Sequence, residues 1–160
     1  MIRKITAQDF NYIYQLYMHP VTNPWLLYEM MDKDSFQPIF DDLLVKDIIY
    51  IYSDEGMDIG MFKFIHQQHR NAHMAYLGGL AIHPDYAGKG YGQKMMQDII
   101  ALGKQMNLIR IELSTATVNE NAIRLYEKAG FAKEGILRKY TWLKNENRFI
   151  DEVMMSIILV

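Results

Sequence analysis

The chain has 160 residues, half of them hydrophobic, and a formal net charge of -2 at pH 7. A chain of this length suits one domain that buries about two-thirds of its unfolded surface, so we expect a single domain over residues 1–160. The small net charge and the absence of a long run of one sign exclude nucleic acid or an anionic membrane as the main partner.

The sequence contains no cysteine. This absence rules out disulfides, thiolate metal sites and a cysteine nucleophile, and a reducing cytoplasm is the compartment we expect. The segment Met1–Ile5 lacks the extended apolar run of a signal peptide, and no stretch approaches the ~18 to 20 apolar residues of a membrane span.

The first part of the chain predicts a strand followed by helices. Thr6 to Asp9 have the pattern of a capping box, which predicts that a helix begins there and runs to about Met18. Pro20 and Pro24 then interrupt the helical pattern. The predicted elements are a strand at Ile2–Ile5, this helix, a short helical piece through Trp25 to Met31, and a helix from Ser35 to Leu44 with Pro38 in its first turn.

Three β-rich runs follow. Asp47–Tyr52 and Met57–His66 are separated by Ser-Asp-Glu-Gly, which predicts a hairpin, and a turn at Asn71 leads to a third strand at His73–Ile82. These runs predict an antiparallel meander.

The next stretch, Leu80 to Met96, changes from strand to glycine-rich loop to helix. Gly88, Gly90 and Gly92 lack a Cβ, so their backbone can turn successive N–H groups toward one point ahead of a helix that begins at about Tyr91. The helix dipole is positive at the same end, and the pattern therefore predicts a phosphate site. The glycine spacing matches neither the dinucleotide fingerprint nor the P-loop, and a turn that only links strand to helix is the structural alternative.

The last part alternates helices and strands. The helix after the loop runs to about Met106, and a strand follows at Leu108–Thr115 with one buried face. Asn119 caps a helix through Lys128, which Gly130 ends. Long strands at 131–143 and 149–159 flank a turn at 144–147, so the whole order is β-α-α-β-β-β-α-β-α-β-β.

The stretch Asn119–Phe131 fits the pattern N-x-x-A-x-x-L-Y-x-x-x-G-F at every specified position, and Gly90 and Gly92 fit the end of [R/Q]-x-x-G-x-[G/A]. With these two motifs in this order, the chain resembles the GNAT superfamily of N-acetyltransferases. The resemblance extends over the element order of essentially the whole chain. It implies an α/β (α+β) fold with a mixed central sheet of about seven strands flanked by about four helices.

The resemblance also implies a cosubstrate and a role for each motif. Acetyl-CoA would donate an acetyl group to an amine, which attacks the thioester directly. Tyr126 would be the general acid that protonates the departing thiolate, and a phenol with an ordinary pKa near 10 holds a proton at neutral pH. The implied cofactor-binding residues are Leu80, Ala81 and Ile82 along the pantetheine arm, Ala87, Gly88, Lys89, Gly90, Tyr91, Gly92 and Gln93 around the pyrophosphate, and Asn119 near the pantetheine.

Two positions depart from the family pattern. Ala87 stands where the motif usually begins with Arg or Gln, which predicts weaker CoA binding. Ser114 stands where some relatives that acetylate protein N-termini carry a glutamate, so no residue is clearly the general base. Glu112 is expected to be solvated or paired and His83 to be a turn residue, while Glu29, Asp151 and a chain of waters stay open as proton acceptors.

The acceptor stays open among an amino acid, a peptide N-terminus and a polyamine. The first helices and the last hairpin would supply aromatic and acidic side chains to its groove, or those acids only form a solvated helix face. No metal site is expected, because His66 and His69 would point to opposite faces of a strand. A CoA-binding module without turnover and a nucleotide-binding regulator are the alternatives from other classes, and a homodimer is expected from the resemblance alone.

Overall fold

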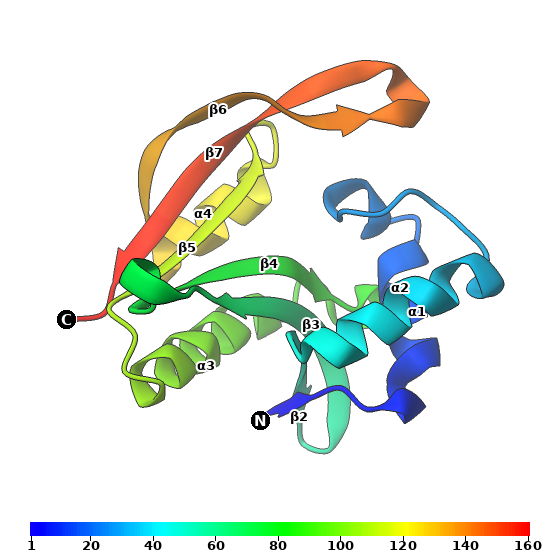
Figure 1. The fold of residues 1–160 in the computed structure, drawn as a ribbon, viewed down its shortest axis with the longest axis horizontal. Coiled ribbons are helices and arrows are strands. Elements are labelled where there is room, and N and C mark those ends of the chain that lie inside the picture. Colours follow the sequence, from blue (N-terminus) through cyan, green and yellow to red (C-terminus); the bar gives the residue numbers. More distant parts are fainter. The chain divides into compact units, whose positions relative to one another are not determined.

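The computed structural model describes residues 1–160, and its strands form one seven-stranded sheet in the order β1-β2-β3-β4-β5-β7-β6 (Figure 1). The strands are β1 (Ile2–Lys4), β2 (Ile49–Asp54), β3 (Met57–His66), β4 (Met74–Ile82), β5 (Arg110–Ala116), β6 (Ala132–Leu143) and β7 (Arg148–Ile158). The helices are α1 (Phe10–Met18), α2 (Lys33–Lys46), α3 (Tyr91–Gln105) and α4 (Glu120–Ala129). The sheet is mixed, because β4 and β5 run parallel while β5 and β7 run antiparallel. This confirms the predicted fold class and element order.

The chain divides into two compact units. The first comprises Met1–Ile65 and Gly78–Tyr91, and the second comprises His66–Leu77 and Gly92–Val160. None of the helices is both long enough and apolar enough to cross a membrane.

The first unit has an aromatic core between α1, α2 and the strands β2 and β3. Burial of these side chains removes apolar area from water and is the main force that holds the helices to the strands. Tyr17 packs against Phe36 and Tyr28 with ring centroids 5.7 and 5.0 Å apart. Fully or almost fully buried members of this core include Ile13, Leu16, Tyr17, Phe36, Phe40, Ile49, Ile51 and Met61.

The β2–β3 hairpin forms as predicted. Glu55 and Gly56 are its two turn residues, both have positive φ (49° and 78°), and Asp54 pairs with Met57. Positive φ at both positions matches the right-handed twist of the flanking strands, which is why a sequence ending in Gly suits this turn.

Two local predictions in the first unit are wrong. Residues 26–32 are not helical: a 3-10 turn at Asn23–Trp25 ends when Leu26 adopts an extended conformation. In addition, α2 begins earlier than predicted, because the Asp32 side chain accepts the N–H of Ser35 and caps it. Pro38 therefore lies in the second turn of α2 and removes one hydrogen bond from the helix interior.

The capping box at Thr6 caps a 3-10 turn at Ala7–Asp9, which leads into α1, and it gives a prediction on stability. Asp9 accepts the backbone N–H of Thr6 at 2.7 Å and both guanidinium nitrogens of Arg3 at 2.9 Å. The Arg3 guanidinium, through these hydrogen bonds, holds the pKa of the Asp9 carboxyl below its ordinary value of 3.8. Because the folded-state pKa is lowered, this contribution to stability is present above the ordinary pKa and is lost as the pH falls through the lowered value.

We expect Asp9→Asn to lower the free energy of unfolding by about 1 to 2 kcal/mol at pH 7, and the difference from the parent protein to shrink as the pH falls below the ordinary carboxyl pKa of 3.8. Urea unfolding at pH 7 and at one pH below 3.8 measures the difference in free energy of unfolding between the two proteins. Glu29→Gln, which changes an exposed carboxylate in a loop, is the control with little expected effect. A loss that is equal at the two pH values would show that the ion pair contributes nothing.

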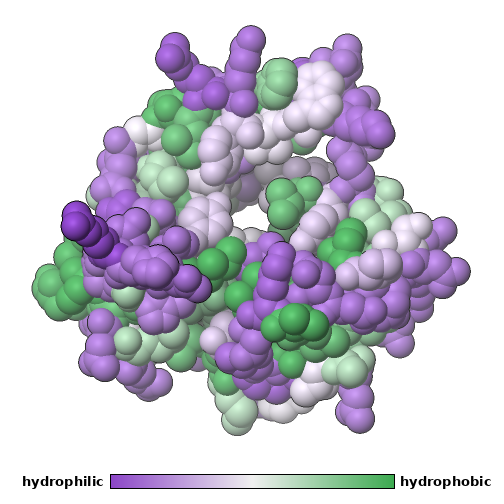
Figure 2. Space-filling view, in the orientation of Figure 1, coloured by the Kyte–Doolittle hydropathy of each residue, from purple (hydrophilic) through white to green (hydrophobic).

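The second unit is organised around the β5–β7–β6 pairing and two helices. Gly103 of α3 allows a close approach to β5, since a Cβ there would lie 2.8 Å from the Ile111 side chain. Residues of β7 pair with β5 from Ile158 back to Glu152 and with β6 along nearly all of the hairpin, which is the long pair of strands in Figure 1. The face of the molecule seen in Figure 2 carries mainly hydrophilic residues, with hydrophobic ones between them.

Candidate active site

The glycine loop lies in the first unit, between a 3-10 turn at Pro84–Tyr86 and the start of α3. Gly88 and Gly90 have φ of 73° and 82°, and a Cβ at either position would meet no atom within 4 Å. Backbone conformation, and not lack of space, therefore requires glycine at these two positions. The N–H groups of Gly88, Lys89 and Gly90 have no hydrogen-bond acceptor in the structure.

Three consecutive free N–H groups immediately ahead of a helix fit a diphosphate, because phosphate oxygens accept from such groups. The Lys89 side chain is exposed, and its ammonium contacts the preceding turn. It donates to the backbone oxygen of Asp85 at 3.1 Å and lies 5.7 Å from the centre of the Tyr86 ring. Ala87 donates its N–H to Pro84 and has no polar side chain to add to the loop.

Gly92 and Gln93 contact helix α4. Both lie in the second unit, in the first turn of α3, and a Cβ at Gly92 would come within 3.2 Å of the Leu125 side chain. The Gln93 side-chain amide donates to the Leu125 backbone oxygen at 3.1 Å. The third glycine of the motif therefore lies at the packing between two helices, whereas the sequence had suggested that all three shape the loop.

The strand before the loop, β4, changes direction at Gly79. This residue has a φ of 54°, and a Cβ there would lie 3.1 Å from the Tyr17 hydroxyl. Leu80, Ala81 and Ile82 follow in the first unit, and Ala81 lies so close to β3 that a Cβ at Gly60 would be 2.4 Å from its carbonyl oxygen. The pairing of β4 with β5 covers Met74 to Tyr76, in the first part of the strand.

Helix α4 holds Asn119 and Tyr126 in the second unit. Asn119 caps the helix: its side-chain oxygen accepts the N–H of Ala122 at 3.3 Å, and its amide nitrogen lies 3.4 Å from the Thr115 hydroxyl. Gly130 ends the helix with a φ of 105°. Both ends of the helix therefore form as the sequence predicted.

The side chain of Tyr126 is 8% exposed, and its ring packs on Phe131 with centroids 6.1 Å apart. Two hydroxyls are fully buried without a hydrogen-bond partner, those of Tyr12 and Tyr17. The Tyr126 hydroxyl also has no partner in the protein, but it is not one of these fully buried groups. Burial, and secondarily the nearby phenol of Tyr76, raises the pKa of Tyr126. The group therefore holds its proton throughout the neutral range and has no protein acceptor for it.

A polar cluster lies on one face of the sheet in the second unit. The Ser114 hydroxyl donates to Oε1 of Glu152 at 2.7 Å, and the Thr141 hydroxyl donates to Oε2. The Tyr76 hydroxyl lies 3.1 Å from the Ser114 hydroxyl. Sequence reasoning missed this cluster, because it joins β4, β5, β6 and β7, and only the strand register places Ser114 beside Glu152.

Most of the other carboxylates considered from the sequence have structural partners. Glu112 pairs with Arg110 at 2.8 Å, which confirms the expectation that it is paired. The His83 ring accepts the N–H of Asp85 at 3.1 Å and so forms the turn, as expected. Three acids from the helices and the hairpin that were expected to shape the acceptor groove have partners inside the chain: Asp41 accepts from Gln37, Asp42 pairs with Lys46, and Asp151 accepts the N–H of Lys139.

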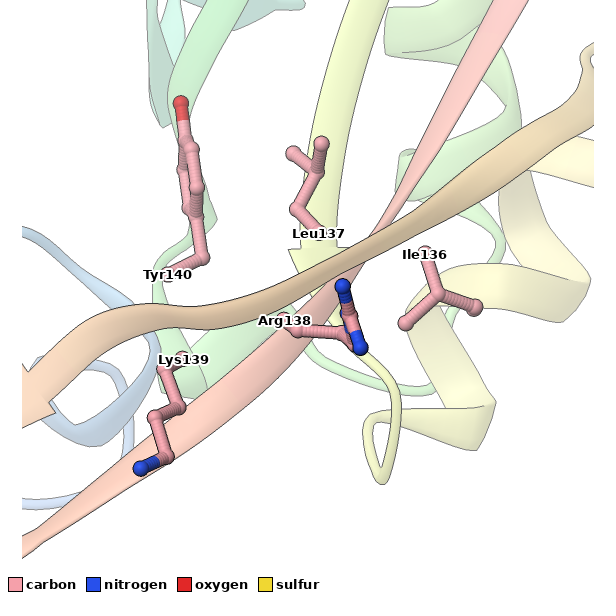
Figure 3. A pocket seen from close by; sticks show the side chains of 5 residues that line it. All are labelled: Ile136, Leu137, Arg138, Lys139 and Tyr140. Atoms are coloured by element: carbon pink, nitrogen blue, oxygen red, sulfur yellow. The ribbon is translucent and has the colours of Figure 1, made fainter.

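A shallow depression of about 530 Å³ lies along β6, lined by Ile136 to Tyr140 (Figure 3). Figure 3 shows Tyr140 and Lys139 extending from opposite sides of the strand. The β6–β7 register shifts between Leu137 and Thr141, and Lys139 has a φ of 49°, so the depression marks a bulge in one edge strand. No group of three His, Cys, Asp or Glu side chains is arranged to hold a metal ion.

Free amide donors ahead of a helix in the first unit fit a phosphate group, and the proton-holding phenol in the second unit can act as an acid. Comparisons with known proteins give the class of protein. The sequence model of the acetyltransferase (GNAT) family matches residues 10–131. The chain is 30% identical over 169 residues to the uncharacterized N-acetyltransferase p20 of Bacillus licheniformis, and the alignment covers 98% of this chain and 91% of that protein.

Two solved structures share the fold over 99% of the chain. Spermidine N-acetyltransferase from Vibrio cholerae, in complex with CoA and spermine, has a TM-score of 0.85 at 20% identity and is covered over 95% of its length. Ribosomal-protein-alanine N-acetyltransferase from Brucella melitensis has a TM-score of 0.79 at 18% identity and is covered over 99%. The chain belongs to the acetyltransferase (GNAT) family. It is an N-acetyltransferase, and acetyl-CoA is its cosubstrate.

Proposed function

We propose that the enzyme moves the acetyl group of acetyl-CoA to the primary amine of an amino acid, a peptide N-terminus or a polyamine, with Tyr126 as general acid. The observation that carries this proposal is the Tyr126 hydroxyl, which holds its proton and has no acceptor in the protein. Acetyl-CoA supplies an activated acyl group on a thiolate leaving group. Tyr126 donates its Oη proton to the sulfur as the thiolate leaves, which makes departure easier at neutral pH.

The loop has the second role in this proposal. The backbone N–H groups of Gly88, Lys89 and Gly90 are proposed to bind the pyrophosphate, together with the first turn of α3 from Tyr91. We further propose that the backbone of Leu80 to Ile82 binds the pantetheine arm in the manner of an added strand. Asn119, whose oxygen already caps α4, is proposed to orient the helix that carries Tyr126 and to lie beside the same arm.

The acceptor is the least specified part of the reaction. The solved relatives named above act on a polyamine and on a ribosomal protein, so both kinds of amine belong in the test. A screen of free-thiol release from acetyl-CoA against amino acids, peptides and polyamines identifies the substrate. The expected result is thiol release with at least one of these amines well above the hydrolysis rate; release that no amine accelerates would contradict the proposed transfer.

We also propose that two copies pair through β6, because this strand lies at the edge of the sheet and leaves backbone groups unpaired. Light scattering would then give twice the chain mass of 18.8 kDa. A mass of one chain at micromolar concentration would contradict the pairing.

A further inference from the structure

The cluster of Tyr76, Ser114 and Glu152 has hydrogen bonds whose direction is fixed by chemistry. An ionised carboxylate only accepts, so the Ser114 hydroxyl donates its single proton to Oε1 of Glu152 at 2.7 Å. Ser114 then has no proton left for Tyr76, so the Tyr76 hydroxyl donates to Ser114 across 3.1 Å. Every proton in the chain therefore points from Tyr76 toward Glu152.

The outer end of this chain is an acceptor. Because the proton of Tyr76 is directed toward Ser114, its oxygen offers lone pairs to a donor from outside the protein. Tyr76 also lies near Tyr126, and its phenol helps to raise the pKa of Tyr126 after burial. The two neighbouring phenols thus differ in function, since Tyr126 has a proton to give and Tyr76 has a lone pair to offer.

The inner end is a carboxylate that retains its capacity to take a proton. Glu152 is half-buried and takes part in no ion pair, whereas Glu112 and Glu134 nearby are both bound by Arg110. Its second oxygen accepts from Thr141, which fixes the orientation of the carboxyl group. Low-dielectric surroundings make such an oriented network energetically stronger than in water.

We propose that Tyr76, Ser114 and Glu152 form a proton relay that accepts the proton of the attacking amine during acetyl transfer. As the new C–N bond forms, the amine N–H bond breaks and its electron pair stays on nitrogen. The proton passes to Oη of Tyr76, the Tyr76 proton to Oγ of Ser114, and the Ser114 proton to Oε1 of Glu152. Glu152 gains one proton and Tyr126 loses one, so exchange with solvent restores both groups.

In this relay Tyr76 touches the substrate, whereas Ser114 and Glu152 act through it as positioning residues. The relay rests on the proposed function, because it needs an amine acceptor. It also explains why the strand position of Ser114 carries no carboxylate. Glu152 delivers one from the neighbouring strand β7 instead, through the serine hydroxyl.

The test compares kcat and KM of Tyr76→Phe, Ser114→Ala, Glu152→Gln and the double variant Tyr76→Phe/Glu152→Gln, using the best amine from the thiol-release screen. Each single change is expected to lower kcat by about ten- to hundredfold with little change in KM for acetyl-CoA. Because all three act on one path, the double variant should be no slower than the slower single variant.

Ser114→Thr, which keeps a hydroxyl, should recover kcat to within about threefold of the parent. Ser156→Ala is the matched control: it removes a serine hydroxyl from the same strand as Glu152, at the position paired with Glu112. Thermal unfolding of every variant separates loss of catalysis from loss of folding.

The relay is contradicted if the single variants keep kcat within threefold, if Ser114→Thr is as slow as Ser114→Ala, or if the defects multiply in the double variant. If the parent protein itself transfers acetyl to no amine, the proposed function fails and the relay fails with it. If the parent protein transfers acetyl and the variants keep its kcat, the relay is wrong and the proposed function still stands.

Discussion

We expect Tyr126→Phe to lower kcat for acetyl transfer by about a hundredfold and to leave the dissociation constant of acetyl-CoA nearly unchanged. The aromatic ring keeps its packing on Phe131, so only the hydroxyl and the proton that it donates are lost. General acids contribute about 10²- to 10⁴-fold, and a thiolate is a good enough leaving group that we expect the lower end of that range. Steady-state thiol release and calorimetric titration measure the two quantities.

The control for this change is Tyr50→Phe. Tyr50 stacks on Phe62 at 5.1 Å in the first unit, so it loses a hydroxyl in the same manner without touching the reaction. If Tyr126→Phe and Tyr50→Phe have the same kcat, Tyr126 is not the general acid.

The second large effect is expected in the loop. The double variant Gly88→Ala/Gly90→Ala places a Cβ on two residues with φ of 73° and 82°, each at a cost of roughly 1 kcal/mol or more. The backbone would relax away from this conformation and turn its N–H groups from the phosphate. We expect the dissociation constant of acetyl-CoA to rise at least tenfold, and thermal stability to fall by no more than the strain that the two residues retain in the unbound protein.

Gly135→Ala is the matched control, because Gly135 lies in β6 with ordinary φ and open space around its Cβ position. Isothermal titration of both variants with acetyl-CoA, and with pantetheine, which carries no phosphate, measures the two dissociation constants of each variant. If the loop variant weakens pantetheine as much as acetyl-CoA, its glycines do not act on the pyrophosphate.

Local signals in the sequence were sufficient for much of the fold. The capping box at Thr6, the Glu-Gly turn and the Asn119 and Gly130 caps each depend on residues within four positions, and all formed as predicted. The segment 26–32 was mispredicted because its apolar residues suggested a helix, whereas Leu26 is extended and Tyr28 packs on Tyr17 from a non-helical segment. In that segment tertiary packing outweighs propensity.

The candidate site also has a part that the sequence predicted and a part that it did not. The loop and Tyr126 were predicted from a motif, whereas the Tyr76–Ser114–Glu152 chain joins residues 38 positions apart in each of its two bonds. A strand pattern shows that Ser114 shares a face with Glu112, but it does not say which residue of another strand lies beside it. Only the β5–β7 register, which pairs Ala116 with Glu152, reveals that neighbour.

The central claim is that the Tyr126 hydroxyl donates a proton to the leaving sulfur. A crystal structure with bound CoA tests it most directly. The account predicts that the CoA sulfur lies within hydrogen-bond reach, about 3.5 Å, of Oη of Tyr126. A sulfur well beyond that distance, with another proton donor beside it, would contradict the claim.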